Sequence, residues 1–297
     1  MSIIERALNK AKDEGRKLGS VTDLPNKIEN NLVEPDINTA KVTDTTENEN
    51  TFDNTKIEHI DWDKLADLGY VTPASQTNTL SVEEYRNIKR PLIVNAFGVG
   101  SVGIARSNLI LVTSSIPGEG KTFTAINLAL SIATERDKKV LLIDADVARP
   151  SVSKTLGIKS SPGLIEYLEG QDVEFSDIVL KTNMPGLSVI PSGKQHKHST
   201  ELLTSNRMVM LAQELSNRYP DRMVIFDSPP LLAATQGEVL AGLVGQVVLV
   251  VEAEKTPQSM VMTSVNKLVF CDVVLVLLNK TLNKAFANNY GYGLYGN

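Results

Sequence analysis

A glycine-rich segment between two apolar runs carries the clearest chemical signal in this sequence. Residues 114–122 read Ser-Ser-Ile-Pro-Gly-Glu-Gly-Lys-Thr and follow the apolar run 109–112. The backbone N–H groups of such a turn, with the start of the helix after it, can cradle a phosphate group. We expect Lys121 to reach the β- and γ-phosphates of a nucleotide and the Thr122 hydroxyl to bind Mg²⁺. Ser115 stands where the G-x-x-x-x-G-K-[ST] pattern has its first glycine, and the alternative is an ordinary surface turn.

Aspartates end two other apolar runs. Asp144 and Asp146 follow one run, and Asp227 follows another. In an open parallel sheet, ligands bind at the carboxyl ends of the strands, so these acids should share a crevice with the glycine-rich loop. We expect Asp227 to position Mg²⁺ and either Asp144 or Asp146 to accept a hydroxyl proton. Read singly, each is also a common turn or helix-cap residue.

The elements that hold these residues alternate between strand and helix. Runs of Val, Ile and Leu that do not alternate with polar residues indicate strands buried on both faces, as in a parallel sheet covered by helices. We therefore predict an α/β fold with a mostly parallel central sheet flanked by helices. Predicted strands span 109–113, 140–144, 187–190, 223–226, 247–251 and 273–278, and predicted helices span 122–134, 163–168 and 200–217.

The first 79 residues differ in composition from the remainder, 80–297. Residues 2–18 fit a short amphipathic helix. Residues 20–79 carry twelve acidic and four basic side chains and few apolar ones, so we predict a mostly disordered linker, with a short helix or binding element within 59–68. A capping box at Ser81 opens the helix that begins the folded domain.

Composition sets limits on partners and compartment. The remainder is almost neutral, which gives no electrostatic case for a nucleic-acid partner, and we expect none. The single cysteine, Cys271, suits a reducing compartment and a core position. No apolar stretch reaches the roughly 18 residues that a membrane-spanning helix needs. We therefore expect a cytoplasmic protein, with any membrane association made through a partner or a surface helix.

Together these segments resemble the bacterial tyrosine kinases, P-loop NTPases related to MinD and ParA. The resemblance covers about residues 80–297 and rests on the loop 114–122, the strand end 141–150 and the segment 225–230. It implies ATP and Mg²⁺ as cofactors. The residues that it places at the nucleotide, with the last at the adenine-reading position, are Pro117, Gly118, Glu119, Gly120, Lys121, Thr122, Phe123, Arg149 and Asn279.

A second match concerns assembly. Glu83, Arg86 and Lys89 are similar to the family's E-x-x-R-x-x-R subunit-contact motif, with lysine as the last residue. The resemblance therefore implies a homo-oligomeric ring. Residues 2–8 and 84–92 are most similar to the subgroup encoded with exosortase-linked exopolysaccharide loci.

Three tyrosines among glycine and asparagine mark the tail, about residues 283–297. Tyr290, Tyr292 and Tyr295 lie where glycine favours an extended, mobile chain. Because the chain also carries the phosphate site, we expect the tail to enter a neighbour's crevice and undergo autophosphorylation. The alternative is a sticky tail without a catalytic role.

The resemblance also implies a pathway, the regulation of exopolysaccharide or capsule biosynthesis and export. It implies a membrane polysaccharide co-polymerase, a Wzz-like chain-length determinant, as activator, together with a tyrosine phosphatase. Through that co-polymerase the protein would be peripheral at the inner membrane. Two other functions stay open, a ParA/MinD-type partitioning or positioning ATPase and a non-catalytic nucleotide-bound scaffold. Pro117 argues against the ATPase, which commonly has a second lysine at that position.

Overall fold

A computed structural model describes residues 57–73, 80–98, 103–170, 172–195, 197–218 and 221–281. All of them belong to one compact unit that begins at Lys56. The predicted helix over 2–18 and the predicted tyrosine tail lie outside the described residues.

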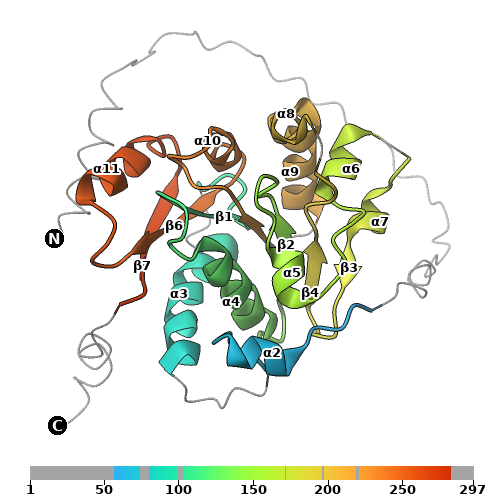
Figure 1. The fold of residues 1–297 in the computed structure, drawn as a ribbon, viewed down its shortest axis with the longest axis horizontal. Helices are drawn as coiled ribbons and strands as arrows, with labels where there is room; N and C mark the ends of the chain where they lie inside the picture. Colours follow the sequence, from blue (N-terminus) through green and yellow to red (C-terminus); the bar gives the residue numbers. More distant parts are fainter. Residues whose placement is uncertain are drawn as a thin grey trace, which may run out of the picture. The chain divides into compact units, whose positions relative to one another are not determined.

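A central sheet organises the described part of the chain (Figure 1). Its seven strands run in the order β3-β4-β2-β5-β1-β6-β7, and every neighbouring pair is parallel except β3 with β4. The strands are β1 (Leu109–Ser114), β2 (Lys139–Asp144), β3 (Leu180–Lys181), β4 (Leu187–Ile190), β5 (Arg222–Asp227), β6 (Gln246–Glu252) and β7 (Val273–Asn279). The predicted parallel α/β fold is confirmed, and β3, with only two residues, escaped prediction.

Helices cover the sheet and explain its apolar strands. In β1, Ile110 and Val112 belong to the core that includes α4, while Leu109 and Leu111 are equally buried on the alternate positions. Both faces therefore need apolar residues. The helices are α2 (Trp62–Asp67), α3 (Leu80–Phe97), α4 (Lys121–Ala133), α5 (Val152–Leu156), α6 (Leu164–Glu169), α7 (Phe175–Ile178), α8 (Ser199–Leu203), α9 (Asn206–Arg218), α10 (Gln236–Ala241) and α11 (Gln258–Asn266).

Residues 57–73, which we name the N-terminal strap, differ from the prediction. Composition assigns them to the linker, whereas Ile60, Leu65 and Val71 are buried in the core and the compact unit begins at Lys56. The short helix expected within 59–68 is present as α2, capped by the Asp61 side chain. A few well-spaced apolar residues fix the strap, and an average over sixty residues conceals them.

Two smaller expectations concern the described residues. Cys271 is buried, as predicted for a core residue. Within the described ranges, none of the helices combines the length and apolarity needed to cross a bilayer.

Candidate nucleotide-binding site

The glycine-rich loop joins β1 to α4, which is the strand–turn–helix arrangement that the motif requires. Gly118 and Gly120 have φ angles of 93° and 96°, in the left-handed region that favours glycine. A Cβ at Gly120 would lie 2.1 Å from Nδ2 of Asn279, so a side chain here would force Asn279 to move from the loop. Gly120 is also the N-cap of α4, which leaves the first N–H groups of this 13-residue helix beside the loop.

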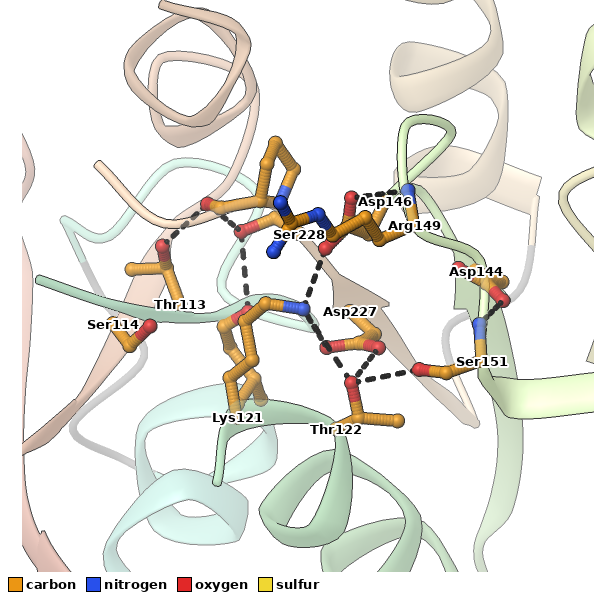
Figure 2. Close-up of polar contacts among 12 residues, drawn as sticks. Thr113, Ser114, Lys121, Thr122, Asp144, Asp146, Arg149, Ser151, Asp227 and Ser228 are labelled. Carbon is orange, nitrogen blue, oxygen red and sulfur yellow. Dashed lines mark hydrogen bonds and ion pairs between the residues drawn. The ribbon is translucent and has the colours of Figure 1, made fainter. Parts of the chain in front are cut away.

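Lys121 and the aspartates converge at the carboxyl ends of β2 and β5 (Figure 2). The Lys121 Nζ donates to Oδ2 of Asp146 at 2.6 Å and lies 3.8 Å from Oδ1 of Asp227. The Thr122 hydroxyl donates to Oδ2 of Asp227 at 2.7 Å. Asp144 faces Asp227 directly across the β2–β5 register. The structure thus brings together residues that the sequence separates by up to about a hundred positions.

Burial controls the charges of this cluster. It raises the pKa of Asp227 to about 6, against the opposing effects of Lys121 and of the Thr122 hydroxyl. It also raises the pKa of Asp144 to about 7, and the charge of Asp227 adds to this shift. Burial works against the charge of Lys121, but Asp227 and Asp146 outweigh it, so the lysine pKa lies above its ordinary value. Carboxyls poised near neutrality beside a fixed cation are typical of functional sites.

The N-terminus of α5 holds Asp144. The backbone N–H groups of Ser151 and Val152 donate to Oδ2 of Asp144 at 3.1 and 3.0 Å. The Ser151 hydroxyl also donates to the Thr122 hydroxyl at 3.1 Å. Ser151 therefore connects the carboxyl end of β2, which carries Asp144, with the start of α4 after the loop. Sequence reasoning missed it, because a serine two residues after Arg149 carries no distinct signal.

The donor set fits Mg²⁺. Asp144 Oδ1 and Asp227 Oδ1 are buried without a hydrogen-bond partner, and the Thr122 hydroxyl lies beside the second carboxylate. Hard oxygen donors of this kind suit Mg²⁺, which keeps waters and phosphate oxygens among its ligands. Among the described residues no group of three or more His, Cys, Asp or Glu can hold a metal ion alone. This arrangement is compatible with Thr122 and Asp227 holding the ion together with phosphate, which stays a prediction.

Contacts from β6 and β7 fix the loop from its other side. The Asn279 Nδ2 donates to the Glu119 carbonyl at 2.9 Å, and the Lys280 Nζ donates to the Gly118 carbonyl at 2.7 Å. The fully buried Glu119 carboxylate accepts from the backbone N–H groups of Ile116 and Glu252. The Glu119 side chain thus shapes the loop, and only its backbone is left for phosphate.

The other predicted nucleotide contacts lie around this centre. Pro117 and Gly118 are exposed at the crest of the loop, and Arg149 is exposed after β2. The Arg149 N–H donates to Oδ1 of Asp146 at 3.1 Å. Phe123 follows Thr122 and packs its ring on Tyr70, with the centroids 4.7 Å apart. These positions are compatible with nucleotide contacts, and the contacts themselves stay predictions.

The predicted subunit-contact residues divide into two kinds. Glu83 and Arg86 form an ion pair on the exposed side of α3. Lys89 is buried, and its Nζ donates to the Ser131 carbonyl at 2.6 Å and pairs with Glu135 at 2.7 Å. Lys89 is therefore engaged within its own chain, and its part in a subunit contact stays a prediction. Its spacing from Arg86 by three residues does not show that α3 turns Lys89 toward α4.

The serine at the first position of the loop has a partner. The Ser264 hydroxyl on α11 donates to the Ser115 hydroxyl at 2.9 Å, and both residues are fully buried. This pair explains the departure from the glycine pattern, because the added side chain links the loop to α11.

Replacing Ser264 with alanine should lower the free energy of unfolding by roughly 1–2 kcal/mol, since it leaves the Ser115 hydroxyl buried without this partner. The double variant with Ser115→Ala should recover part of the loss. Urea denaturation measures both, with Ser259→Ala on the exposed side of α11 as control. Strictly additive losses would contradict the pairing.

Comparison with known proteins places the chain among relatives. A family described as "AAA domain" matches residues 107–268. Tyrosine-protein kinase YwqD of Bacillus subtilis is 32% identical over 228 residues, which cover 76% of this chain and 91% of that protein. Tyrosine-protein kinase ptk of Acinetobacter johnsonii is 32% identical over 197 residues, covering 66% of this chain but only 26% of that protein.

A solved structure of a tyrosine kinase domain is also similar to this chain. The kinase domain of the Escherichia coli tyrosine kinase ETK is 25% identical, with a TM-score of 0.59, over 81% of this chain and 95% of that one. The fold and site define a P-loop nucleotide-binding protein of the α/β class. Given the Bacillus relative, the chain belongs to the family of bacterial tyrosine-protein kinases. The predicted family is confirmed, and the narrower similarity to exosortase-linked enzymes stays a prediction.

Proposed function

We propose that the protein is an ATP-dependent protein-tyrosine autokinase. The observation that carries the proposal is the convergence of Lys121 and Thr122 with aspartates from two other strand ends. Phosphoryl transfer needs a fixed cation, a Mg²⁺ site and a carboxylate that positions the nucleophile, and this cluster contains candidates for all three. Membership of a family of tyrosine-protein kinases supports a phenol as the acceptor.

The proposed reaction uses each residue of the cluster. The loop N–H groups and Lys121 bind the triphosphate, and Lys121 exchanges its contact with Asp146 for phosphate oxygens. The tyrosine oxygen then bonds to the γ-phosphorus as the bond to ADP breaks, and Asp144 or Asp146 accepts the phenol proton. Thr122 and Asp227 would hold Mg²⁺, which would supply positive charge to stabilise the phosphate oxygens.

The proposed acceptors are Tyr290, Tyr292 and Tyr295 in the tail, mostly of a neighbouring subunit. Each phosphate adds roughly −1.5 to −2 charges. Several on one tail repel each other and the aspartates, so the modified tail leaves the crevice and the ring loosens. The exposed Glu83 and Arg86 on α3 are proposed subunit contacts.

After incubation of the full chain with MgATP, we expect phosphate on the peptide that follows Lys284. Peptide mass spectrometry locates it. Changing the three tail tyrosines to phenylalanine should remove most of the phosphate, while Tyr167→Phe should leave it unchanged. ATP hydrolysis without any phosphotyrosine would overturn the proposal in favour of a partitioning-type ATPase.

A mixing experiment tests transfer between subunits. A Lys121→Met chain with an intact tail serves as acceptor, and an active chain without tail tyrosines serves as donor. Phosphate on the acceptor supports transfer between subunits, and its absence restricts transfer to one chain.

The wider role follows the family resemblance. We propose that the phosphorylation cycle regulates exopolysaccharide or capsule biosynthesis and export. Its partners are a membrane polysaccharide co-polymerase as activator, which holds the protein at the inner membrane, and a tyrosine phosphatase that resets the tail.

A further inference from the structure

The N-terminal strap contacts α4 and α5, the two helices beside the phosphate site. Its start is paired with the edge of the sheet, since the Glu58 N–H donates to the Lys181 carbonyl at 2.8 Å and the Asn183 N–H donates to the Glu58 carbonyl at 3.0 Å. In its middle, Leu65 of α2 is fully buried in the core. These contacts fix the path of the strap before it reaches Tyr70.

Tyr70 lies between the two elements. Its ring packs on Phe123, in the first turn of α4 and directly after Thr122, with the centroids 4.7 Å apart and the planes tilted by 46°. Its phenol also interacts with the side chain of Thr155 on α5, the helix whose N-terminus holds Asp144. Burial raises the pKa of Tyr70, and the charge of Asp227 adds to the shift, so the phenol is neutral at physiological pH and lies within the field of the site.

The next residue continues the contact through the backbone. The Val71 N–H donates to Oδ1 of the fully buried Asn127 at 2.7 Å. The Asn127 Nδ2 donates in turn to the Phe123 carbonyl at 3.1 Å. The strap thus reaches the first turn of α4 by two routes, a ring contact and a chain of two hydrogen bonds.

We propose that Tyr70 is a positioning residue for nucleotide binding, which holds the first turn of α4 against α5 through Phe123 and Thr155. Lys121 and Thr122 lie on that turn and Asp144 is bound by α5, so loss of the ring lets the two halves of the phosphate site separate. The inference concerns nucleotide affinity, and it therefore stands or falls independently of whether tail tyrosines accept phosphate.

Titration calorimetry of the full chain with MgADP tests the inference. Tyr70→Ala should weaken binding by about tenfold, because the ring contact is lost. Tyr70→Phe, which keeps the ring on Phe123 but removes the phenol contact with Thr155, should have a smaller effect, of about threefold. Leu68→Ala is the matched control, since Leu68 lies on the same strap but is 54% exposed, and it should bind normally.

A general loss of folding is separated from a positioning role by the stoichiometry. Misfolding lowers the fraction of chains that bind and leaves the dissociation constant unchanged, whereas poor positioning raises the constant at full stoichiometry. Tyr70→Leu is the second variant, chosen to retain apolar bulk if the alanine variant does not fold. A folded alanine or leucine variant that binds MgADP as tightly as the unaltered chain would overturn the inference.

Discussion

Replacing Lys121 with methionine is expected to lower the rate of tyrosine phosphorylation by roughly 10²–10³-fold, the usual effect of removing one preorganised charge stabiliser. Methionine keeps an unbranched side chain, so the loop can retain its shape. The lost ammonium is the group that joins Asp146 to Asp227 and that we assign to the transferring phosphate. Initial rates of phosphate incorporation at saturating ATP measure the effect.

The control for this variant is Lys154→Met. Lys154 lies on α5, close in sequence to the residues that hold Asp144, but it is exposed. We expect its substitution to leave the rate within about twofold. A Lys121→Met enzyme that retained more than a tenth of the rate would show that the loop lysine is not the main source of charge stabilisation.

Replacing Asp144 with asparagine should change activity and stability in opposite directions. Activity should fall by roughly 10²-fold if this carboxylate accepts the phenol proton. Stability of the nucleotide-free protein at pH 8 should rise by roughly 1–2 kcal/mol, or about 2–8 °C in Tm for a domain of this size. Asparagine can keep both N–H contacts from α5 through its one carbonyl oxygen, because Oδ2 of Asp144 accepts both of them.

The pH dependence gives the sign of the stability change. The pKa of Asp144 is about 7 in the folded protein, against an ordinary value of 3.8. Between these values the folded chain holds a proton that the unfolded chain releases, so stability falls as the pH rises. This stabilising contribution is complete below about pH 4 and is lost by about pH 7, and the asparagine variant, which cannot ionise, should not show this loss.

Thermal unfolding at pH 5 and pH 8 measures this difference. The Tm of the unaltered chain should fall more between the two pH values than that of the Asp144→Asn variant. Asp172→Asn, at an exposed position, serves as the control. A variant less stable than its parent at pH 8 would show that the buried carboxylate stabilises the fold.

The sheet was predictable because its strands are buried on both faces. Continuous apolar runs therefore located six of the strands. The strap was not predictable in the same way, because Ile60, Leu65 and Val71 depend on distant surfaces such as α4 for their burial. Sequence patterns report the faces of regular elements well, and they report poorly on short segments that cross several elements.

The site shows the same division. The loop and its aspartates follow strand ends, so a parallel sheet brings them together by topology alone. Ser264 and Ser151 carry no such mark, and the partner of Ser264 lies 149 residues away in the sequence. The burial of Lys89 was not predictable for a similar reason, because its spacing from Glu83 and Arg86 suits a contact within the chain as well as one between chains.

The clamp of Lys280 on Gly118 fixes where the tail is tethered. A fully extended chain spans at most about 3.3–3.6 Å per residue, so chain length limits Tyr290 to roughly 35 Å from Lys280 and Tyr295 to roughly 50 Å. The tail therefore starts beside the phosphate loop of the chain that carries it. Any assembly in which one subunit phosphorylates the tail of the next must therefore keep its own nucleotide-binding site within that distance of the neighbour's Lys280. This requirement sets an upper bound on the spacing of sites around a ring.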